Sequence, residues 1–456
     1  MLTTGTDRKR IAESLTQARA MAQRTGTNSP WIISIPRPAV DILSWLASAE
    51  ASEKWYWRDR EGGVEIGGTG CGFTIHPTLT GKTLQKINEL LASLADRDAF
   101  FFSAQWFTND HPRGTIWSDF PLEIGVIPKN AVVNEDGEYR LTICREVRPD
   151  ADIDALVSEA ERLTDNFSSH VSTLKIEMLP RLVSENSHPS LDQWRDNIQD
   201  ILRSVGSDQI EKVVLARCKE YRFERPVDAI GLLAHLQRQN RSCYSILFQP
   251  APETAFISVT PERLYRRQDR TISIDALSST VPRGTNPDDD GRLEQKLLES
   301  DKQRREHRIV IDGMLDDIGA LCDSSPAAGR TVVMKLDRIQ HLYTPIMGNL
   351  RHGVSDAEII EALHPTPATA GRPKAAALEK INRLEAFDRG WYAAPIGLMS
   401  RDDADFAVGI RSAVVRKETV SVFSGAGIVS GSDPDGEWRE IESKDIIRHL
   451  IQGGHQ

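Results

Sequence analysis

SGAGIVSGSDPDGEWREIESK, residues 424–444, is the stretch of this chain that says most about its fold and its site. It follows the β-branched and aromatic run TVSVF, which predicts a strand, and it opens with the small residues Gly425, Ala426 and Gly427. Small residues of this kind let backbone N–H groups approach a bound anion closely. A tight turn at the end of the strand explains the same spacing equally well. The stretch matches neither glycine pattern of nucleotide-binding loops, which argues against a nucleotide site.

The second half of this stretch predicts a helix with charged side chains on one face. Glu437 and Glu440 are three residues apart and Glu440 and Lys444 are four apart, so the three side chains share a face. A second helical segment, ESDKQRREHRIVIDGML, carries Glu306 between a charged half and an apolar half. Carboxylates without His or Cys partners favour a hard cation, and Mg²⁺ takes one or two of them with water and substrate oxygens. Solvated helix faces with ion pairs between successive turns are the commoner cause of such a pattern.

Outward from this stretch, strands and helices alternate unequally and without a repeat. Short apolar runs separated by Gly, Pro, Asn and Asp between residues 31 and 144 predict antiparallel strands. The whole pattern predicts an α+β fold of large, mostly antiparallel β-sheets flanked by helices. Strands are expected at 212–223, 244–249, 254–259, 271–277, 405–415 and 419–428, and helices at 153–174, 191–206, 227–239, 292–322, 356–363, 374–384 and 437–451.

We divide the chain into three parts. Residues 1–30 are expected to form a leading helix or tail, because apolar residues recur at helical spacing from Ile11 to Met21. A targeting segment is the alternative for this part. Residues 31–185 are expected to be an N-terminal β-rich part of the same fold, and residues 186–456 the part that carries the site. The polar segment SENSHPS, residues 184–190, predicts the connection between them.

The composition is that of an ordinary globular protein. The chain has 456 residues, with 56 Lys and Arg against 66 Asp and Glu, and a formal net charge of −10. Basic residues are scattered among acidic ones, so nucleic acid is not expected as a partner. No apolar run reaches the roughly 20 residues that span a bilayer, so no membrane is expected either. The five cysteines are widely separated and lack C-x-x-C spacing, which predicts reduced thiols and a cytoplasmic protein.

Seven segments, taken in order, are similar to those of the chorismate-binding enzymes, and the resemblance runs from about residue 207 to residue 451. This family contains isochorismate synthases, salicylate synthases, anthranilate synthase large subunits and aminodeoxychorismate synthases. The resemblance implies the family's fold and a catalytic part at residues 186–456. The segments are KVVLAR from Lys212, TPERL with Glu262, REHR with Glu306, QHLYT with His341, LHPTPATAG at 363–371, AVGIRSA with Arg411, and the stretch 424–444.

Within the family, the chain most resembles an isochorismate synthase. Lys212 stands where ammonia-using anthranilate synthases have a glutamine, and a lysine can deprotonate water. The stretch ALSSTVPRG, residues 276–284, lacks the lysine with which aminodeoxychorismate synthases attack the ring. Salicylate synthase is the alternative, but LHPTPATAG and WYAAPIG look more like isochorismate synthases. We expect a monomer or weak homodimer without a glutamine amidotransferase subunit.

The resemblance implies a reaction in which chorismate gains water at ring carbon two and loses the hydroxyl of ring carbon four. Lys212 would be the base that activates the water, and Glu262 the acid that protonates the leaving hydroxyl. The first must then be an uncharged amine and the second a protonated carboxyl, and burial favours both uncharged forms. Without the resemblance, a surface lysine at a strand end and a carboxylate paired with Arg263 would be the simpler interpretations.

The resemblance also implies a Mg²⁺ ion and a set of substrate-binding residues. Glu306 and Glu440 match the metal ligands of the family, and Glu437 matches a carboxylate that contacts the ion through water. Arg411 suits the enolpyruvyl carboxylate, and pairing with Asp405 is the alternative for an arginine within a strand. The implied substrate-binding residues are Thr280, His341, Ala368, Thr369, Ile410, Arg411, Gly425, Ala426, Gly427 and Lys444.

Two positions depart from the family pattern. Where relatives commonly read A-G-T, this chain has Ser278, Ser279 and Thr280, so Ser279 replaces a glycine that lets the backbone reach the substrate. Thr369 stands where an aliphatic residue is common in isochorismate synthases, and it could change which nucleophile or elimination the ring pocket tolerates. The first departure bears on binding strength and the second on the final product.

Overall fold

The structure, a computed structural model, describes residues 5–75, 83–93, 99–108, 116–165, 167, 172–207 and 209–453. Its helices are α1 (Gly5–Thr25), α2 (Ile42–Ser48), α3 (Thr83–Ser93), α4 (Ile153–Asp165), α5 (Leu191–Gly206), α6 (Ala229–Arg238), α7 (Pro287–Glu299), α8 (Asp301–Gly319), α9 (Asp356–Leu363), α10 (Lys374–Leu384), α11 (Pro434–Ser443) and α12 (Arg448–Gly453). Its strands are β1 (Ser29–Pro36), β2 (Lys54–Arg58), β3 (Val64–Ile75), β4 (Phe101–Gln105), β5 (Glu123–Glu135), β6 (Glu138–Val147), β7 (Leu182–His188), β8 (Lys212–Phe223), β9 (Tyr244–Ala251), β10 (Thr254–Thr260), β11 (Arg263–Gln268), β12 (Thr271–Pro282), β13 (Ala327–Ala328), β14 (Val332–Lys335), β15 (Ile339–Asn349), β16 (Gly371–Arg372), β17 (Pro395–Met399), β18 (Asp403–Val408), β19 (Ser412–Arg416) and β20 (Thr419–Ile428).

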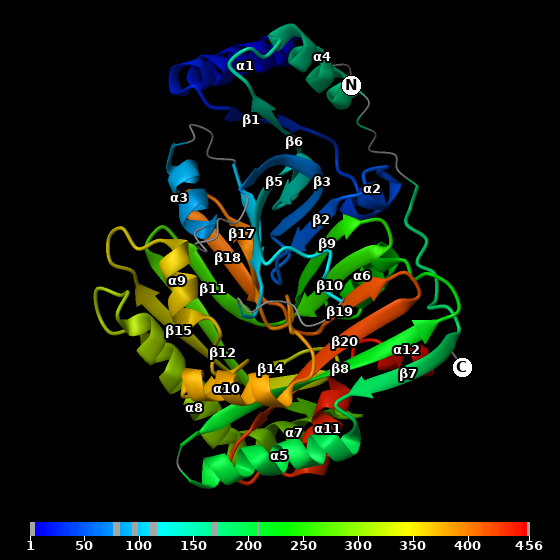
Figure 1. Cartoon of the computed structure of the whole chain (residues 1–456), viewed down its shortest axis with the longest axis vertical. Coiled ribbons are helices and arrows are strands. Elements are labelled where there is room, and N and C mark those ends of the chain that lie inside the picture. The colour runs from blue at the N-terminus through cyan, green and yellow to red at the C-terminus, as the bar shows by residue number, and fades with distance from the viewer. Residues whose placement is uncertain are drawn as a thin grey trace.

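The strands join into one large antiparallel sheet that folds back on itself, as the α+β prediction requires. From β7 the hydrogen bonds run through β8, β20, β19, β10, β9, β2 and β3 to β5. From β5 they continue through β4, β17, β18, β11 and β12 to β15. Early strands are thus inserted between late ones. Helices α5, α8 and α11 cover the lower part in Figure 1, and α1 and α4 lie together at the top on β1 and β6.

The main core is rich in aromatic side chains where the early and late strands meet. The Phe248 ring stacks on Trp391 with centroids 4.9 Å apart, and on Trp55 at 4.1 Å. Trp55 and Phe248 are also register partners in the pairing of β2 with β9. Burying a large apolar side chain stabilises the fold by roughly 1.5–3 kcal/mol. This stack therefore fixes β2 firmly against the strands of the later part of the chain.

One segment predicted as a connection is a strand. Most of residues 184–190 lie in β7, which pairs with β8 from Leu182↔Phe223 to His188↔Cys218. Most of the β7 side chains are exposed, so this strand shows no alternation of apolar and polar residues. The polar composition that suggested a connection is that of an exposed edge strand.

The helix predicted over 292–322 is in fact two helices that meet at Ser300. The Ser300 N–H donates to the Lys296 carbonyl at the end of α7, while its Oγ accepts from the Gln303 N–H at the start of α8. A serine that can cap a helix start interrupts an otherwise continuous helical pattern. The helix predicted over 437–451 is likewise divided into α11 and α12.

Two other elements are shorter than predicted. The strand expected over 405–415 is interrupted between β18 and β19, where Arg411 has a φ of 48°. This left-handed conformation cannot continue a strand. The helix expected over 153–174 ends as α4 at Asp165, and residues 166 and 168–171 of that prediction lie outside the described residues. The helix expected within residues 1–30 is α1.

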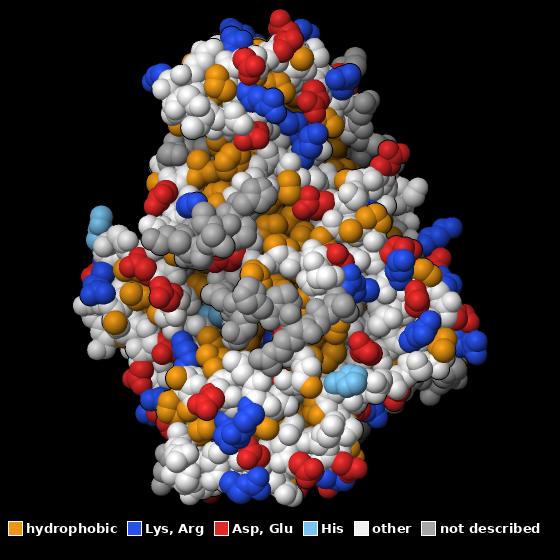
Figure 2. All heavy atoms as spheres, viewed as in Figure 1, with side chains coloured by type: hydrophobic (Ala, Val, Ile, Leu, Met, Phe, Trp, Pro, Cys, Tyr) orange, Lys and Arg blue, Asp and Glu red, His pale blue; other side chains and the backbone are white. Residues whose placement is uncertain are grey.

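Charges of both signs are interspersed over the face of the molecule shown in Figure 2. This agrees with the scattered Lys and Arg residues of the sequence. Across the described ranges, the longer helices are too polar to cross a membrane.

Candidate active site

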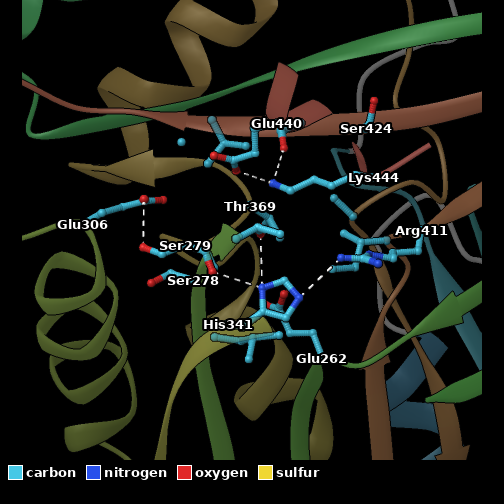
Figure 3. Close-up of a pocket in the computed structure, with 18 of the residues that line it drawn as sticks. Glu262, Ser278, Ser279, Glu306, His341, Thr369, Arg411, Ser424, Glu440 and Lys444 are labelled. Carbon is cyan, nitrogen blue, oxygen red and sulfur yellow. Dashed lines mark hydrogen bonds and ion pairs between the residues drawn. The ribbon is translucent and has the colours of Figure 1, made fainter. Parts of the chain in front are cut away.

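A pocket lies where β8, β12, β15 and β20 meet α8 and α11 (Figure 3), and thirteen of the fifteen residues predicted for the site line it. Ala426 does not, because successive side chains of a strand point to opposite faces and Ala426 points into the aromatic core. Glu437 also lies outside the lining, although it belongs to the same helix as Glu440. The thirteen are Lys212, Glu262, Thr280, Glu306, His341, Ala368, Thr369, Ile410, Arg411, Gly425, Gly427, Glu440 and Lys444.

Eight further residues of the described part of the chain line the pocket, although the sequence did not assign them to the site. Val214 and Phe423 each lie two positions from a predicted residue of their strand, so strand alternation could have identified them. Tyr392 lies in WYAAPIG, the segment that distinguished the subfamilies. The full set is Val214, Leu277, Ser278, Ser279, Tyr392, Ala393, Phe423 and Ser424.

Lys212 begins β8, and its side chain is only 1% exposed, so the interpretation as a surface lysine is wrong. Its Nζ lies 3.0 Å from Oε1 of Glu306 on α8. A Cβ atom at Gly427 would lie 2.4 Å from this Oε1 and 2.6 Å from the Lys212 Cε. Only glycine at position 427 therefore leaves room for the ion pair between Lys212 and Glu306.

Gly425 makes room for another lining residue, since a Cβ atom there would lie 2.7 Å from the Tyr392 hydroxyl oxygen. The Gly425 carbonyl accepts a hydrogen bond of 2.8 Å from Lys444 Nζ, and this ammonium also pairs with Glu440 Oε1 at 2.7 Å. Both glycines lie within β20 and pair with β8, so the interpretation as a tight turn is wrong.

Glu262 follows β10 and is buried, and within the described part of the chain it forms no ion pair. The hydrogen bonds of the described residues leave its Oε1 without a partner, and neighbouring Arg263 pairs with Glu61 at 2.8 Å instead. Burial, followed by the negative charge of Asp275, raises the Glu262 pKa to about 8, although Lys212 opposes the shift. The carboxyl group is therefore largely protonated at neutral pH and can donate a proton into the pocket. The simpler interpretation, pairing with Arg263, is wrong.

The three carboxylates predicted near a metal are each paired with a lysine. Glu306 pairs with Lys212, Glu440 with Lys444, and Glu437 with Lys302 at 2.5 Å. Burial and then the Glu440 charge raise the Glu437 pKa, so these two carboxylates repel each other. Among the described residues, His, Cys, Asp and Glu side chains do not gather in threes closely enough to enclose an ion alone. Glu306 and Glu440 are the two that reach the pocket.

His341 lies between Arg411 and the backbone of β12 (Figure 3). Its Nδ1 lies 3.1 Å from the Ser279 carbonyl and from Thr280 Oγ1, and its Nε2 lies 3.3 Å from Arg411 Nη2. Burial and then the Arg411 charge hold the His341 pKa well below its usual value, so the ring is neutral. With Nδ1–H donating to the carbonyl, Nε2 accepts from Arg411 and orients the guanidinium. The alternative partner Asp405 instead bonds Tyr244 and Arg263.

Thr369 lines the pocket, and its hydroxyl donates to the Thr366 carbonyl at 3.3 Å. Its side chain has nearly the same shape as that of valine, an aliphatic residue. Apolar side chains such as Leu277, Ile410 and Phe423 share the wall with charged groups of both signs. The cations are Lys212, Arg411 and Lys444, and the carboxylates of Glu306 and Glu440 oppose them. Such a pocket suits a small anionic ring compound.

Comparisons with known proteins match this chain to one family. The family model for chorismate binding enzymes matches residues 14–450. Isochorismate synthase MenF of Escherichia coli is 30% identical over 443 residues, which cover 92% of this chain and 94% of that protein. Chloroplastic isochorismate synthase 2 of Arabidopsis thaliana is 37% identical over 281 residues, which cover 61% of this chain and half of that longer protein.

A solved structure is similar to this chain over nearly its full length. The structure of MenF, the menaquinone-specific isochorismate synthase from Escherichia coli, covers 96% of this chain and 100% of that chain, with a TM-score of 0.80 and 28% identity. The antiparallel fold and the family match thus agree along nearly the whole sequence, and the motifs agree with both from about residue 207 onward. This chain belongs to the chorismate-binding enzyme family.

Proposed function

We propose that this protein is a Mg²⁺-dependent isochorismate synthase that converts chorismate to isochorismate. The observation that carries the proposal is that Lys212 and Glu262, an amine and a largely protonated carboxyl, are both buried and line the same pocket. Relatives named as isochorismate synthases support the assignment, and one of them matches over 94% of its length. The reaction is an isomerisation, because one water enters and one leaves.

Lys212 and Glu262 would divide the proton transfers between them. Lys212 takes a proton from the water whose oxygen bonds to ring carbon two, and the ring double bonds shift. This role requires the uncharged amine, so the ammonium that pairs with Glu306 must first release its proton. Glu262 gives its proton to the hydroxyl on ring carbon four, which leaves as water. General acid–base catalysis of this kind contributes about 10²–10⁴-fold per group. The missing hydrogen-bond partner of Glu262 Oε1 suits a group that is to contact a ligand.

The donor set fits a magnesium ion. Glu306 and Glu440 offer hard oxygen ligands at the pocket, and the repulsion between Glu437 and Glu440 is what a cation would relieve. When bound, the ion would supply charge neutralisation and orientation for a substrate carboxylate. Because two carboxylates are few ligands, water and substrate oxygens would complete the coordination.

Arg411 and Lys444 would hold the anionic groups of the substrate. Arg411 presents a planar guanidinium whose direction is set by neutral His341, which suits recognition of a carboxylate by two parallel hydrogen bonds. Lys444 is held by hydrogen bonds to the Gly425 carbonyl and Glu440. Apolar residues of the lining, such as Leu277, Ile410 and Phe423, would contact the ring.

Product identification tests the proposal. The purified protein is incubated with chorismate, with Mg²⁺ or with a chelator, and the products are separated chromatographically. We expect isochorismate as the sole product, and its formation should stop when the chelator removes Mg²⁺ and resume when Mg²⁺ is restored. Release of pyruvate with salicylate would instead make the protein a salicylate synthase. Full turnover with chelator would remove the metal from the proposal.

A further inference from the structure

Ser279 adopts a backbone conformation that favours glycine. Its φ is 54°, in the left-handed region, and its side chain is buried. The pairing of β12 with β15 shifts register between Ser278 and Thr280, so Ser279 is the extra residue of a β-bulge. A Cβ atom in this conformation crowds the following carbonyl, a strain that glycine avoids. Serine at position 279 therefore destabilises the fold relative to glycine, unless a contact of its side chain compensates for the strain.

The Ser279 hydroxyl points at Glu306 on α8, as Figure 3 shows. Its Oγ lies 3.2 Å from Glu306 Oε2 and 3.3 Å from the Gln303 carbonyl. A hydroxyl has one hydrogen to donate, and a carboxylate is the stronger acceptor. Ser279 therefore donates to Glu306.

This hydrogen bond completes the contacts of the Glu306 carboxylate. Oε1 pairs with Lys212, and Oε2 accepts from Ser279. The next hydroxyl along the bulge, on Ser278, bonds Nδ1 of His307 at 2.7 Å. Hydrogen bonds of Ser278 and Ser279 thus join the bulge to α8. In an undistorted strand these two successive side chains would point to opposite faces.

We propose that Ser279 is a positioning residue, whose hydroxyl fixes the orientation of the Glu306 carboxylate toward a divalent cation. This inference rests on the proposed function, in which Glu306 holds Mg²⁺. Groups that orient a metal ligand typically change metal affinity 10–100-fold when they are removed. In this chain the backbone strain at Ser279 would be compensated by a more firmly oriented Glu306 carboxylate.

Two substitutions separate the hydroxyl from the backbone strain. Ser279→Ala and Ser279→Gly both remove the hydroxyl, but only Ser279→Gly relieves the strain. Each variant is assayed for its melting temperature without metal and for the Mg²⁺ concentration that gives half-maximal turnover of chorismate. We expect both to need about 10-fold more Mg²⁺ than the wild type. We expect Ser279→Gly to melt about 1–2 °C above Ser279→Ala.

Lys417 provides a matched control, because it is exposed in a hairpin away from the pocket and has a φ of 52°. Lys417→Gly should also melt above Lys417→Ala, while both retain the wild-type Mg²⁺ requirement. An unchanged Mg²⁺ requirement in both Ser279 variants would overturn the inference and leave the proposed function intact. A raised requirement in Ser279→Gly alone would overturn it too, because the backbone would then be responsible. Wild-type turnover independent of Mg²⁺ would overturn this inference together with the metal part of the proposed function.

Discussion

Lys212 Nζ lies 3.0 Å from Glu306 Oε1 inside the pocket, so the proposed base and a proposed metal ligand are paired with each other. The pair is buried and crosses from the start of β8 to the middle of α8. A divalent ion bound to Glu306 would share this carboxylate with the ammonium group of Lys212. The two roles are therefore coupled through a single side chain.

Lys212→Met should lower the turnover of chorismate by about 10²–10⁴-fold, because the thioether cannot accept a proton from water. Lys219→Met is the matched control, since Lys219 lies on the same strand, is also buried, and pairs with Glu185 away from the pocket. Steady-state assays with saturating Mg²⁺ compare the two variants. Near-normal turnover of Lys212→Met would remove this residue from the mechanism.

Glu262→Gln should change how the melting temperature depends on pH, and it should also remove the proposed general acid. The folded wild type keeps the Glu262 proton up to its raised pKa of about 8, while the unfolded chain releases it near the ordinary pKa of 4.5. The wild type therefore loses stability as pH rises between these values. The melting temperature of Glu262→Gln, relative to the wild type, should increase from pH 5 to pH 8 and level off above.

Glu379 is exposed, so Glu379→Gln is the control for the Glu262 measurement. Its melting temperature should depend on pH as that of the wild type does. A constant difference between Glu262→Gln and the wild type at every pH would mean that the Glu262 pKa is not raised.

Glu440→Gln should raise the Mg²⁺ concentration for half-maximal turnover by about 10-fold or more, because it removes an anionic ligand. Asp435→Asn changes another carboxylate of α11, but one that is exposed and pairs with Arg195. Titration of Mg²⁺ into both variants should affect Glu440→Gln alone. Equal requirements in the two variants would exclude Glu440 from metal binding.

Gly427→Ala should lower turnover by about 10²-fold, since the added methyl group would lie 2.4 Å from Glu306 Oε1 and must displace it or Lys212. Gly206→Ala, at the end of α5, meets no atom within 4 Å and should behave as the wild type. Circular dichroism of both variants checks that they remain folded. A fully active Gly427→Ala would show that the close packing of the pair is dispensable.

Thr369→Val should leave turnover within about 3-fold of the wild type, because the Thr369 hydroxyl is bonded to the Thr366 carbonyl and valine has nearly the same shape. The Thr366 carbonyl keeps its bonds from the Thr369 and Ala370 N–H groups, so stability should fall by less than about 1 kcal/mol. Product analysis shows whether this position affects the reaction. A change of product from isochorismate to salicylate would assign the specificity to the hydroxyl.

Much of the fold was predictable because its elements carry regular patterns. The strand at 212–223 and the helix at 191–206 are found at the predicted residues. β7 was not predictable, since a strand exposed on most of its length has no apolar alternation. Ser300 likewise ends one helix and caps the next within a continuous helical pattern.

Most residues that line the pocket were predictable from the family motifs, and the differences between the prediction and the structure have physical causes. Ala426 was grouped with its two glycine neighbours, although a period of two places it on the opposite face of β20. Arg411 was expected within a strand, but its left-handed backbone depends on long-range packing that no local pattern records. The pairing of Glu306 with Lys212 joins positions almost a hundred residues apart, which spacing alone cannot detect.

The described residues that line the pocket all lie between Lys212 and Lys444, yet β2 and β4 of the early chain are hydrogen-bonded to β9 and β17. β2 and β4 thus support later strands that carry the site, without lining the pocket themselves. Substitutions on the exposed surface of these early strands should be well tolerated. Deleting them would leave β9 and β17 each without one of its hydrogen-bonded neighbours and would expose the aromatic stack to water.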